Sequence, residues 1–303
     1  MRSNRYKVAI HCQTFNHARF IEDMLKGIVM QETDFPFIAV VIDDCSTDGN
    51  VEIIRRYEAE YPDIIKGIYL TENHYSQQKS IWPYWEPYAE SCEYIAICEG
   101  DDYWTDPLKL QKQVDLMDKH PECTLCITNA DVVADGATEK FPFDFGELEE
   151  KAYSANELIY DWKAATASFL FRSRVLKTEQ FAKIKYNKKL IISDIVLVML
   201  CNAHGSILAL PDKTCSYRQH GGGFTRQMRT PKYEYKFAIF WNECRRIFPE
   251  FSEALLYKEI EYHFSGIVSF LFRKEFSIKY FCISVLHCLG HPKQTLKRAL
   301  KLK

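Results

Sequence analysis

The stretch Glu99-Gly-Asp-Asp-Tyr-Trp-Thr-Asp-Pro107 directly follows the apolar run Tyr94–Cys98. An apolar run of this length is typical of a strand that is buried on both faces of a sheet. Paired aspartates at the exit of such a strand lie where open α/β sheets bind ligands, at the carboxyl ends of the strands. Asp101 and Asp102 would repel each other as neighbouring carboxylates, and Mg²⁺ or Mn²⁺ would offset that repulsion.

The same stretch also has a simpler interpretation, a solvated acidic turn that leads into a helix. Asp106 is of a residue type favoured at helix N-caps, and Pro107 is favoured at the first helical position. Both interpretations place a helix directly after the acidic residues. The choice between a ligand site and a capped turn therefore depends on the rest of the chain.

Three apolar runs before residue 94 predict further strands, and amphipathic or polar segments between them predict helices. The strands are expected at Lys7–Cys12, Phe37–Ile42 and Gly67–Leu70, with helices at about 18–31 and 51–61. Alternating strands and helices of this kind form a doubly wound, mostly parallel sheet flanked by helices, so we predict an α/β fold. The glycine fingerprints of dinucleotide-binding and P-loop proteins are absent after the first strand, which excludes those two readings.

The composition indicates a globular protein without a charge bias. The 303 residues carry a formal net charge of −2, which gives no argument for binding nucleic acid. The 11 cysteines are scattered, and no secretory segment opens the chain, so we expect reduced thiols and a cytoplasmic location. No apolar stretch is long enough to span a bilayer.

Three segments in order resemble the successive motifs of the family 2 glycosyltransferases: Thr14–His17, Asp43–Gly49 and Glu99–Pro107. The resemblance covers roughly residues 5–225. It implies a GT-A fold and an inverting, metal-dependent enzyme that uses Mn²⁺ or Mg²⁺. The implied reaction moves a hexosyl or N-acetylhexosaminyl group from a nucleoside diphosphate sugar, with a UDP-sugar expected, to a hydroxyl of a glycan or lipid-linked acceptor. A bacterial capsule, exopolysaccharide or lipopolysaccharide is the expected product.

The resemblance also implies roles for residues in the first half of the chain. Gln13, Thr14 and Phe15 match the nucleotide-binding positions after the first strand, although Phe15 could instead be a core aromatic. Asp44 matches the aspartate that accepts the base N–H, and its neighbour Asp43 could instead hold the loop. The implied metal ligand is Asp102, with Asp101 facing the ribose or the outer sphere of the metal. Trp104 would flank the donor sugar or the acceptor, or would simply pack.

In the second half, the resemblance implies a general base and a group near the diphosphate. Asp194 opens an amphipathic helix where the family carries its base, with Ser193 in place of a first acid; the alternative is a favourable charge at the helix N-terminus. His220 would approach the metal or diphosphate, and Arg218 could contact the donor, or both could be ordinary loop residues. One departure is the segment 72–79, which lacks the arginine that many members carry, so its contacts cannot be transferred.

These expectations divide the chain into a catalytic domain at 1–230 and a helical C-terminal region at 231–303. The catalytic domain comprises a nucleotide-binding half, 1–128, and an acceptor half, 129–230. The C-terminal region is aromatic and then basic, which suits contact with a membrane surface or with a second copy of the chain. A non-catalytic module that binds nucleotide sugars and a nucleotidyltransferase of similar fold remain the alternatives.

Overall fold

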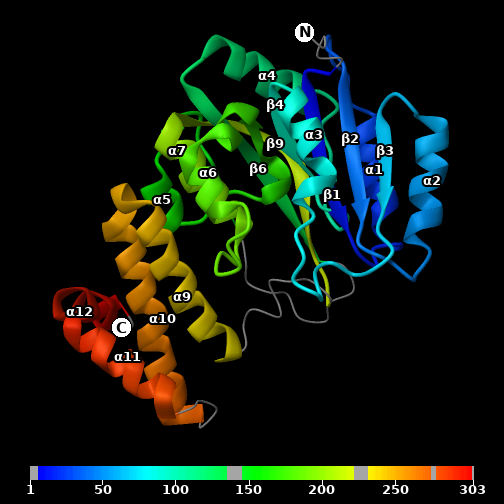
Figure 1. The fold of residues 1–303 in the computed structure, drawn as a ribbon. Helices are drawn as coiled ribbons and strands as arrows, with labels where there is room; N and C mark the ends of the chain where they lie inside the picture. The colour runs from blue at the N-terminus through cyan, green and yellow to red at the C-terminus, as the bar shows by residue number, and fades with distance from the viewer. Residues whose placement is uncertain (1–5, 135–144, 222–230, 274–277, 302–303) are drawn as a thin grey trace. The chain divides into compact units, whose positions relative to one another are not determined.

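The computed structural model describes residues 6–134, 145–221, 231–273 and 278–301 (Figure 1). Its contacts divide the chain into two compact units. The first unit contains residues 1–154, 162–186 and 204–220, and the second contains 155–161, 187–203 and 221–303. This division differs from the single boundary at residue 230 expected from the sequence, because the segment 187–203 groups with the C-terminal helices.

The first unit is built on a nine-stranded sheet. Its strands are β1 (Val8–Thr14), β2 (Phe37–Asp43), β3 (Ile65–Tyr69), β4 (Tyr94–Ile97), β5 (Tyr103–Trp104), β6 (Cys123–Ala134), β7 (Ala152–Tyr153), β8 (Leu170–Arg172) and β9 (Ser206–Gln219). The order is β3-β2-β1-β4-β8-β6-β9-β5, with β7 also paired to β9. Strands β1–β4, β6 and β9 run in one direction, and β5, β7 and β8 run against them. The predicted mostly parallel sheet is confirmed.

Helices α1 (Ile21–Val29), α2 (Asn50–Glu60), α3 (Trp82–Ser91), α4 (Lys109–Lys119) and α6 (Glu179–Ile184) belong to this unit. Helix α1 buries Ile21, Met24, Leu25 and Ile28, the face predicted from their helical spacing. Gly27 is also required there, because an added Cβ would lie 2.7 Å from the backbone oxygen of Trp104. This close approach sets α1 directly against the strand that follows the acidic loop.

The second half of the sheet is longer than its apolar runs indicate. The runs at 124–128 and 207–211 predict short strands, whereas β6 and β9 pair in parallel along Cys123–Ala134 and Ser206–Gln219. The pairing register shifts at Asn129, and this irregularity breaks the alternation of apolar and polar residues that marks a strand in sequence.

Two further segments have patterns that suggest local structure. The apolar segment 166–172 predicts a strand, and the structure has a short 3₁₀ turn, Thr166–Ser168, followed by β8. The aromatic segment 141–145 resembles a flexible lid, and its residues 141–144 lie outside the described residues.

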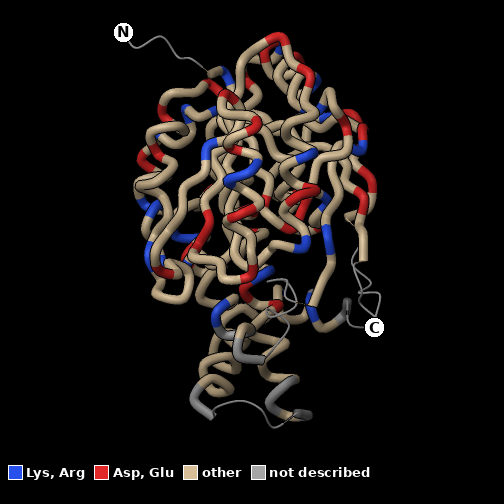
Figure 2. The backbone as a smooth tube through the Cα atoms, turned by 90° about the vertical axis from the view of Figure 1, so that its right-hand side faces the viewer, with Lys and Arg blue, Asp and Glu red and all other residues tan. Residues whose placement is uncertain are grey.

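The second unit is helical, with α5 (Ala155–Tyr160), most of α7 (Ser193–His204), α9 (Pro231–Ile247), α10 (Ser252–Arg273), α11 (Ile278–Gly290) and α12 (Pro292–Lys301). The C-terminal helical region predicted from the sequence is therefore present. Among the described residues, none of the helices combines the length and apolar character needed to cross a membrane. All 11 cysteines are free thiols, and acidic and basic positions are interspersed along the chain (Figure 2).

Lys109, in the first turn of α4, is fully buried beneath the acidic loop. Its Nζ donates a hydrogen bond of 2.7 Å to Oε1 of Gln113 and lies 4.4 Å from the centroid of the Trp104 ring. Burial lowers the pKa of Lys109 to about 8. A lysine in this environment destabilises the fold while it is charged, because its ammonium group has lost its hydration shell.

We predict that Lys109→Met raises the free energy of unfolding at pH 7 by up to about 3 kcal/mol, less the cost of leaving Gln113 without its donor. Below pH 8 the lysine is charged in both the folded and the unfolded state, so its destabilising effect is complete. Between the folded pKa of about 8 and the ordinary 10.5, the folded protein has lost the proton that the unfolded chain retains. The advantage of the variant should therefore shrink as pH rises through this window.

Urea denaturation of both proteins between pH 6 and pH 10 measures this trend. A stability difference that stays constant over the whole range would contradict the prediction.

Candidate active site

The loops that carry the predicted site residues leave one edge of the sheet in the first unit. Strands β1, β2, β4 and β9 are parallel, so their carboxyl ends, near Thr14, Asp43, Ile97 and Gln219, lie along the same edge. The sequence therefore brings the three early motifs and His220 to one place, as open α/β sheets do for their ligands.

Asp101 and two histidines form a possible metal site at this edge. Oδ2 of Asp101 lies 3.0 Å from Nε2 of His220 and 3.9 Å from Nε2 of His17. One ligand atom from each of the three residues lies within 4.8 Å of the others. A carboxylate oxygen and two imidazole nitrogens converging in this way can bind a divalent transition metal such as Mn²⁺.

Asp102 points into the protein, away from these histidines. Its side chain is 2% exposed, and Oδ1 accepts a hydrogen bond of 2.9 Å from the backbone N–H of Arg218. The sequence led us to expect Asp102 as the metal ligand; in the structure Asp101 is the carboxylate that lies beside the two histidines, and Asp102 accepts a hydrogen bond within the protein. Sequence position alone could not distinguish them, because they differ only in the direction that each side chain takes.

Arg218 fastens the acidic loop to the end of β9. Its Nε donates to the backbone oxygen of Asp101 at 2.9 Å, and Nη2 donates to Oδ2 of Asp23 at 2.8 Å. The guanidinium group also lies about 5 Å from the ring centroids of Phe20 and Tyr103. This arginine is thus used for positioning in the described structure, where the sequence led us to expect a direct donor contact.

The electrostatics of the loop follow from this arrangement. Burial raises the pKa of Asp102 well above its usual value, and the neighbouring charge of Asp101 raises it further. Burial alone would also raise the pKa of Asp101, but the hydrogen bond from His220 and the charges of both histidines outweigh burial and lower it. Burial lowers the pKa of His17, against the opposing effect of Asp101. Asp101 is consequently the ionised carboxylate of the pair.

Gly100 permits the close contact between the acidic loop and the end of β1. An added Cβ would lie 2.4 Å from Oγ1 of Thr14 and 2.9 Å from Nδ1 of His17. The Gly100 N–H donates to the backbone oxygen of Gln13 at 3.0 Å. Gly100 and His17 were not singled out from the sequence, although both lie within the quoted motifs. A histidine just after a strand that ends at the ligand edge was the available signal.

The residues expected to bind the nucleotide differ in how accessible they are. Phe15 is 42% exposed and is therefore not a core aromatic, whereas Thr14 is buried and half-buried Gln13 contributes its backbone oxygen. Asp44 is fully buried, and its two oxygens accept hydrogen bonds from the backbone N–H groups of His74 and Tyr75 at 2.7 and 3.0 Å. Asp44 thus holds the segment 73–75 at the site.

Asp43 holds the neighbouring loop in a similar way. Its Oδ1 accepts from the Ser46 N–H at 2.9 Å, and its Oδ2 accepts from Nδ2 of Asn50 at 2.7 Å. Asp43 therefore holds a loop, as the sequence suggested, and Asp44 also holds one, which the sequence did not suggest.

Trp104 packs in the core and does not face a ligand. It is 2% exposed, and its Nε1–H donates a hydrogen bond of 2.9 Å to the backbone oxygen of Ala167. The expected contact with the donor sugar or acceptor is wrong for this residue, and the alternative of packing is correct. Its partner strand β9 and the close approach of Gly27 leave the indole no path to solvent.

Asp194 lies in the first turn of α7, in the second unit. The side chain is half-buried, and its Oδ1 accepts a hydrogen bond of 2.7 Å from the N–H of Ile195. A carboxylate at this end of a helix interacts favourably with the helix dipole.

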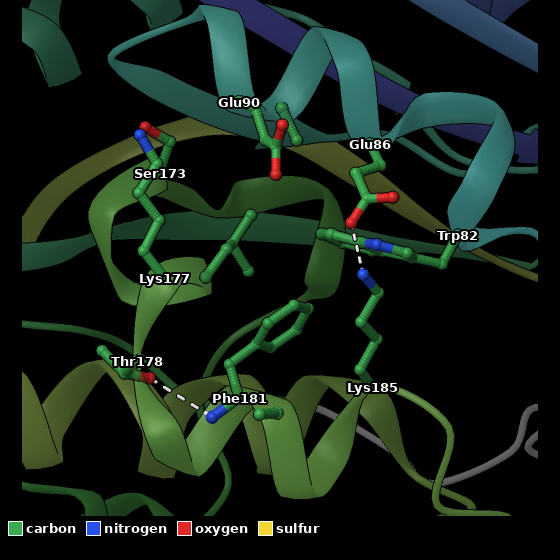
Figure 3. Close-up of a pocket in the computed structure, with 11 residues that line it drawn as sticks. Trp82, Glu86, Glu90, Ser173, Lys177, Thr178, Phe181 and Lys185 are labelled. Atoms are coloured by element: carbon green, nitrogen blue, oxygen red, sulfur yellow. Dashed lines mark hydrogen bonds and ion pairs between the residues drawn. The ribbon is translucent and has the colours of Figure 1, made fainter.

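A separate cavity of about 230 Å³ lies between α3 and the segment 173–185 (Figure 3). Its walls combine the rings of Trp82 and Phe181, 4.8 Å apart, with the ion pair between Glu86 and Lys185. Apolar rings with a few charged groups are typical of pockets for polar small molecules. None of the residues that line this cavity belongs to the Asp101 cluster.

The sequence profile described as Glycosyl transferase family 2 matches residues 10–175. This chain belongs to glycosyl transferase family 2. An uncharacterized protein of Mycobacterium tuberculosis is 32% identical over 226 residues, which span 73% of this chain and 61% of that protein. The dTDP-rhamnosyl transferase RfbG of Shigella flexneri is 26% identical over 188 residues, 61% of each chain. The matches thus cover about 61% of the length of these relatives.

Solved structures show the same fold. This family 2 chain resembles Staphylococcus aureus TarS 1–349 in complex with UDP-GlcNAc, with a TM-score of 0.64 and 18% identity over 92% of this chain and 79% of TarS. It also resembles a mannosyltransferase from Pyrobaculum calidifontis in complex with GDP-Man and Mn²⁺, with a TM-score of 0.56 and 15% identity over 97% and 84% of the two chains. The predicted GT-A fold is confirmed.

We predict opposite effects from two aromatic substitutions at this edge. Trp104→Phe removes a buried hydrogen bond and some volume, so it should lower the free energy of unfolding by about 1–3 kcal/mol and leave nucleotide affinity unchanged. Phe15→Ala, at an exposed position, should change stability by less than about 0.5 kcal/mol and weaken nucleotide binding. Urea denaturation measures the free energy of unfolding, and calorimetric titration with UDP and GDP measures the nucleotide affinity. If Trp104→Phe folds stably but binds nucleotide more weakly, the prediction is wrong and Trp104 contributes to the donor site.

Proposed function

We propose that this chain is an inverting glycosyltransferase that moves a sugar from a nucleoside diphosphate sugar to a hydroxyl of a growing bacterial glycan. The observation that carries the proposal is the convergence of His17, Asp101 and His220 at the ligand edge of a family 2 sheet. A UDP-sugar is our first choice of donor, supported by the UDP-GlcNAc complex of TarS, and the transferred group would be a hexosyl or N-acetylhexosaminyl unit.

The residues at the edge fit a divalent cation, and we assign it to His17, Asp101 and His220. The fit rests on the convergence of the three ligand atoms and on Nδ1 of His17, which is buried without a hydrogen-bond partner among the described residues. Mn²⁺, which accepts imidazole as well as carboxylate ligands, would if bound there neutralise the negative charge that develops on the departing diphosphate. Mg²⁺ is the second choice, because it prefers oxygen ligands. In this assignment Asp102 is not a metal ligand; it holds the acidic loop in place through its hydrogen bond from the Arg218 backbone.

The remaining residues of the edge would bind and orient the nucleotide. The exposed ring of Phe15 would stack on the base, beside backbone groups of Gln13 and Thr14. Asp44 would keep the segment 73–75 in place as one wall of the base pocket. Because Asp44 and Arg218 are already engaged within the protein, their contribution would be to fix the geometry before the donor arrives.

We assign the general base to Asp194. Its carboxylate would accept the proton of the acceptor hydroxyl as that oxygen attacks the anomeric carbon and the bond to the diphosphate breaks. A positioned base of this kind typically contributes about 10²–10⁴-fold to the rate. The position of Asp194 on α7, the helix at which family members are expected to carry this residue, supports the assignment.

We predict that two substitutions separate binding from chemistry. Asp101→Asn should abolish the part of the UDP-induced rise in thermal midpoint that requires Mn²⁺, because it removes the only carboxylate facing the two histidines among the described residues. Asp194→Asn should keep that rise and lower transfer from a UDP-sugar by about 10²–10⁴-fold. Asp115→Asn, which removes one exposed hydrogen bond on α4, is the control and should change neither.

Near-normal turnover by Asp194→Asn would make the assignment of the base wrong. Nucleotide binding without release of UDP by the wild type, over a panel of donors and acceptors, would identify a binding module in place of an enzyme. A rise in the thermal midpoint with GDP or dTDP but not with UDP would agree with the proposed fold and site, but the donor would then be a GDP- or dTDP-sugar.

For the C-terminal helices, we propose contact with an anionic membrane surface on the cytoplasmic side. Ile283, Leu286 and Leu289 on α11 and Leu296 on α12 are 37–71% exposed, and exposed Lys293 lies between them in the chain. Apolar side chains beside a basic residue suit the interface of acidic lipids. A second copy of the chain is the other occupant that such a surface could take.

Sedimentation with vesicles containing phosphatidylglycerol tests this proposal. Wild type should bind, and the double variant Leu286→Gln, Leu289→Gln should lose about tenfold or more of its vesicle affinity, because each buried leucine contributes about 1.5–3 kcal/mol. The membrane proposal would be overturned if the wild type does not bind vesicles but forms a dimer, and if the same double variant is monomeric.

A further inference from the structure

A second group of possible metal ligands lies in the helical unit, on α10 and α11. Glu259 and His263 are four residues apart on α10, so they share one face of the helix, and His287 comes from α11. Glu259 is 3% exposed and His263 is 5% exposed. One ligand atom from each of the three residues lies within 4.8 Å of the others. The proposed transfer reaction uses none of them.

The contact between Glu259 and His287 has the geometry of two metal ligands. Oε1 of Glu259 lies 3.4 Å from Nε2 of His287, and this nitrogen is buried without a satisfactory hydrogen bond among the described residues. In a tetrahedral zinc site with ligand bonds of about 2.0–2.2 Å, neighbouring ligand atoms are about 3.3–3.6 Å apart. The two atoms are therefore already spaced as an ion between them would require.

The partners of these side chains resemble the outer contacts that orient metal ligands. Nδ1 of His263 forms a hydrogen bond of 3.0 Å with Oγ of Ser284, which leaves Nε2 as the atom for a metal. Oε2 of Glu259 lies 3.1 Å from Nη2 of Arg245, so one carboxylate oxygen is held and Oε1 faces the histidines. Hydrogen bonds of this kind fix the ring and carboxylate orientation in natural metal sites.

We propose that Glu259, His263 and His287 bind one Zn²⁺ ion that fastens α11 to α10. Two nitrogen donors and one oxygen donor form a set that zinc accepts readily, whereas Mg²⁺ and Ca²⁺ prefer oxygen ligands alone. His287 is 19% exposed, so water can complete the coordination. The positive charge of Arg245 opposes the ion, but the same residue holds Glu259 in place. This site is independent of the proposed transferase function.

Zinc binding to the full chain tests the proposal, with Asp101→Asn as background so that the first histidine cluster does not contribute. After treatment with a chelator, the Asp101→Asn protein should bind one Zn²⁺ in competition with a zinc indicator, and its thermal midpoint should rise. Adding His287→Gln should weaken this binding by more than about 100-fold, since loss of a ligand exceeds the 10–100-fold typical of an outer contact. Adding His120→Gln, at an exposed histidine, should leave it unchanged.

Ser284→Ala provides a second and milder variant. It removes only the hydroxyl that orients His263 and should weaken zinc binding by about 10–100-fold while the helices remain folded by circular dichroism. If His287→Gln fails to fold, Ser284→Ala and the separate variant Glu259→Gln test whether zinc binds at this site. The proposal is overturned if the Asp101→Asn protein takes up no zinc at micromolar free concentration, or if its uptake is indifferent to these three substitutions.

Discussion

The hydrogen bond from the Arg218 backbone to the buried carboxylate of Asp102 is the interaction on which the active-site geometry depends. Two consecutive aspartates cannot both face the same low-dielectric space without strong repulsion. The chain resolves this conflict by turning one side chain inward to a backbone N–H and the other outward to His220. Because Arg218 belongs to β9 and the aspartates follow β4, the same bond ties together two strands that are distant in the sheet order.

Close backbone packing keeps this arrangement rigid. Gly100 allows the acidic loop to touch the end of β1, and Gly27 allows α1 to touch the backbone of Trp104. At both positions a methyl group would meet an atom less than 3 Å away, so the loop is held between neighbours that cannot retreat without moving the sheet. Preorganisation of this kind matters for a charged ligand, since the protein then has little to rearrange when a diphosphate binds.

The sequence predicted the parts of the fold that local pattern controls. Buried apolar runs located β1, β2 and β4 to within two residues, and their shared direction placed the polar residues that follow them at one edge. The lengths of β6 and β9 could not be predicted, because the outer half of β9 is polar, the pairing register shifts at Asn129, and the two outer halves pair with each other. The packing of Trp104 could not be predicted either, since the sequence around an aromatic residue does not show whether its ring faces the solvent or the core.

The roles within the acidic motif were the hardest to predict. Asp101 and Asp102 differ only in side-chain direction, which is set by Arg218, more than a hundred residues away in the sequence. The contacts of Asp44 could not be predicted for the same reason. Its partners are the N–H groups of residues 74 and 75, which belong to a segment without a recognisable sequence pattern. Motif order therefore predicted which residues lie together at the edge of the sheet, but tertiary contacts decided the direction of each carboxylate.

The two histidine clusters differ in ways that bear on the ions they suit. Around Asp101 the carboxylate stays ionised and both of its neighbours are partly accessible, so a cation there can exchange and can share its coordination sphere with a ligand that arrives from solvent. Around Glu259 two of the three side chains are almost wholly buried, and the carboxylate is already held by Arg245. An ion held there has little room for substrate and would act by joining helices. Similar side chains can thus favour a catalytic ion at one position and a structural ion at another, because solvent access sets the number of open coordination places.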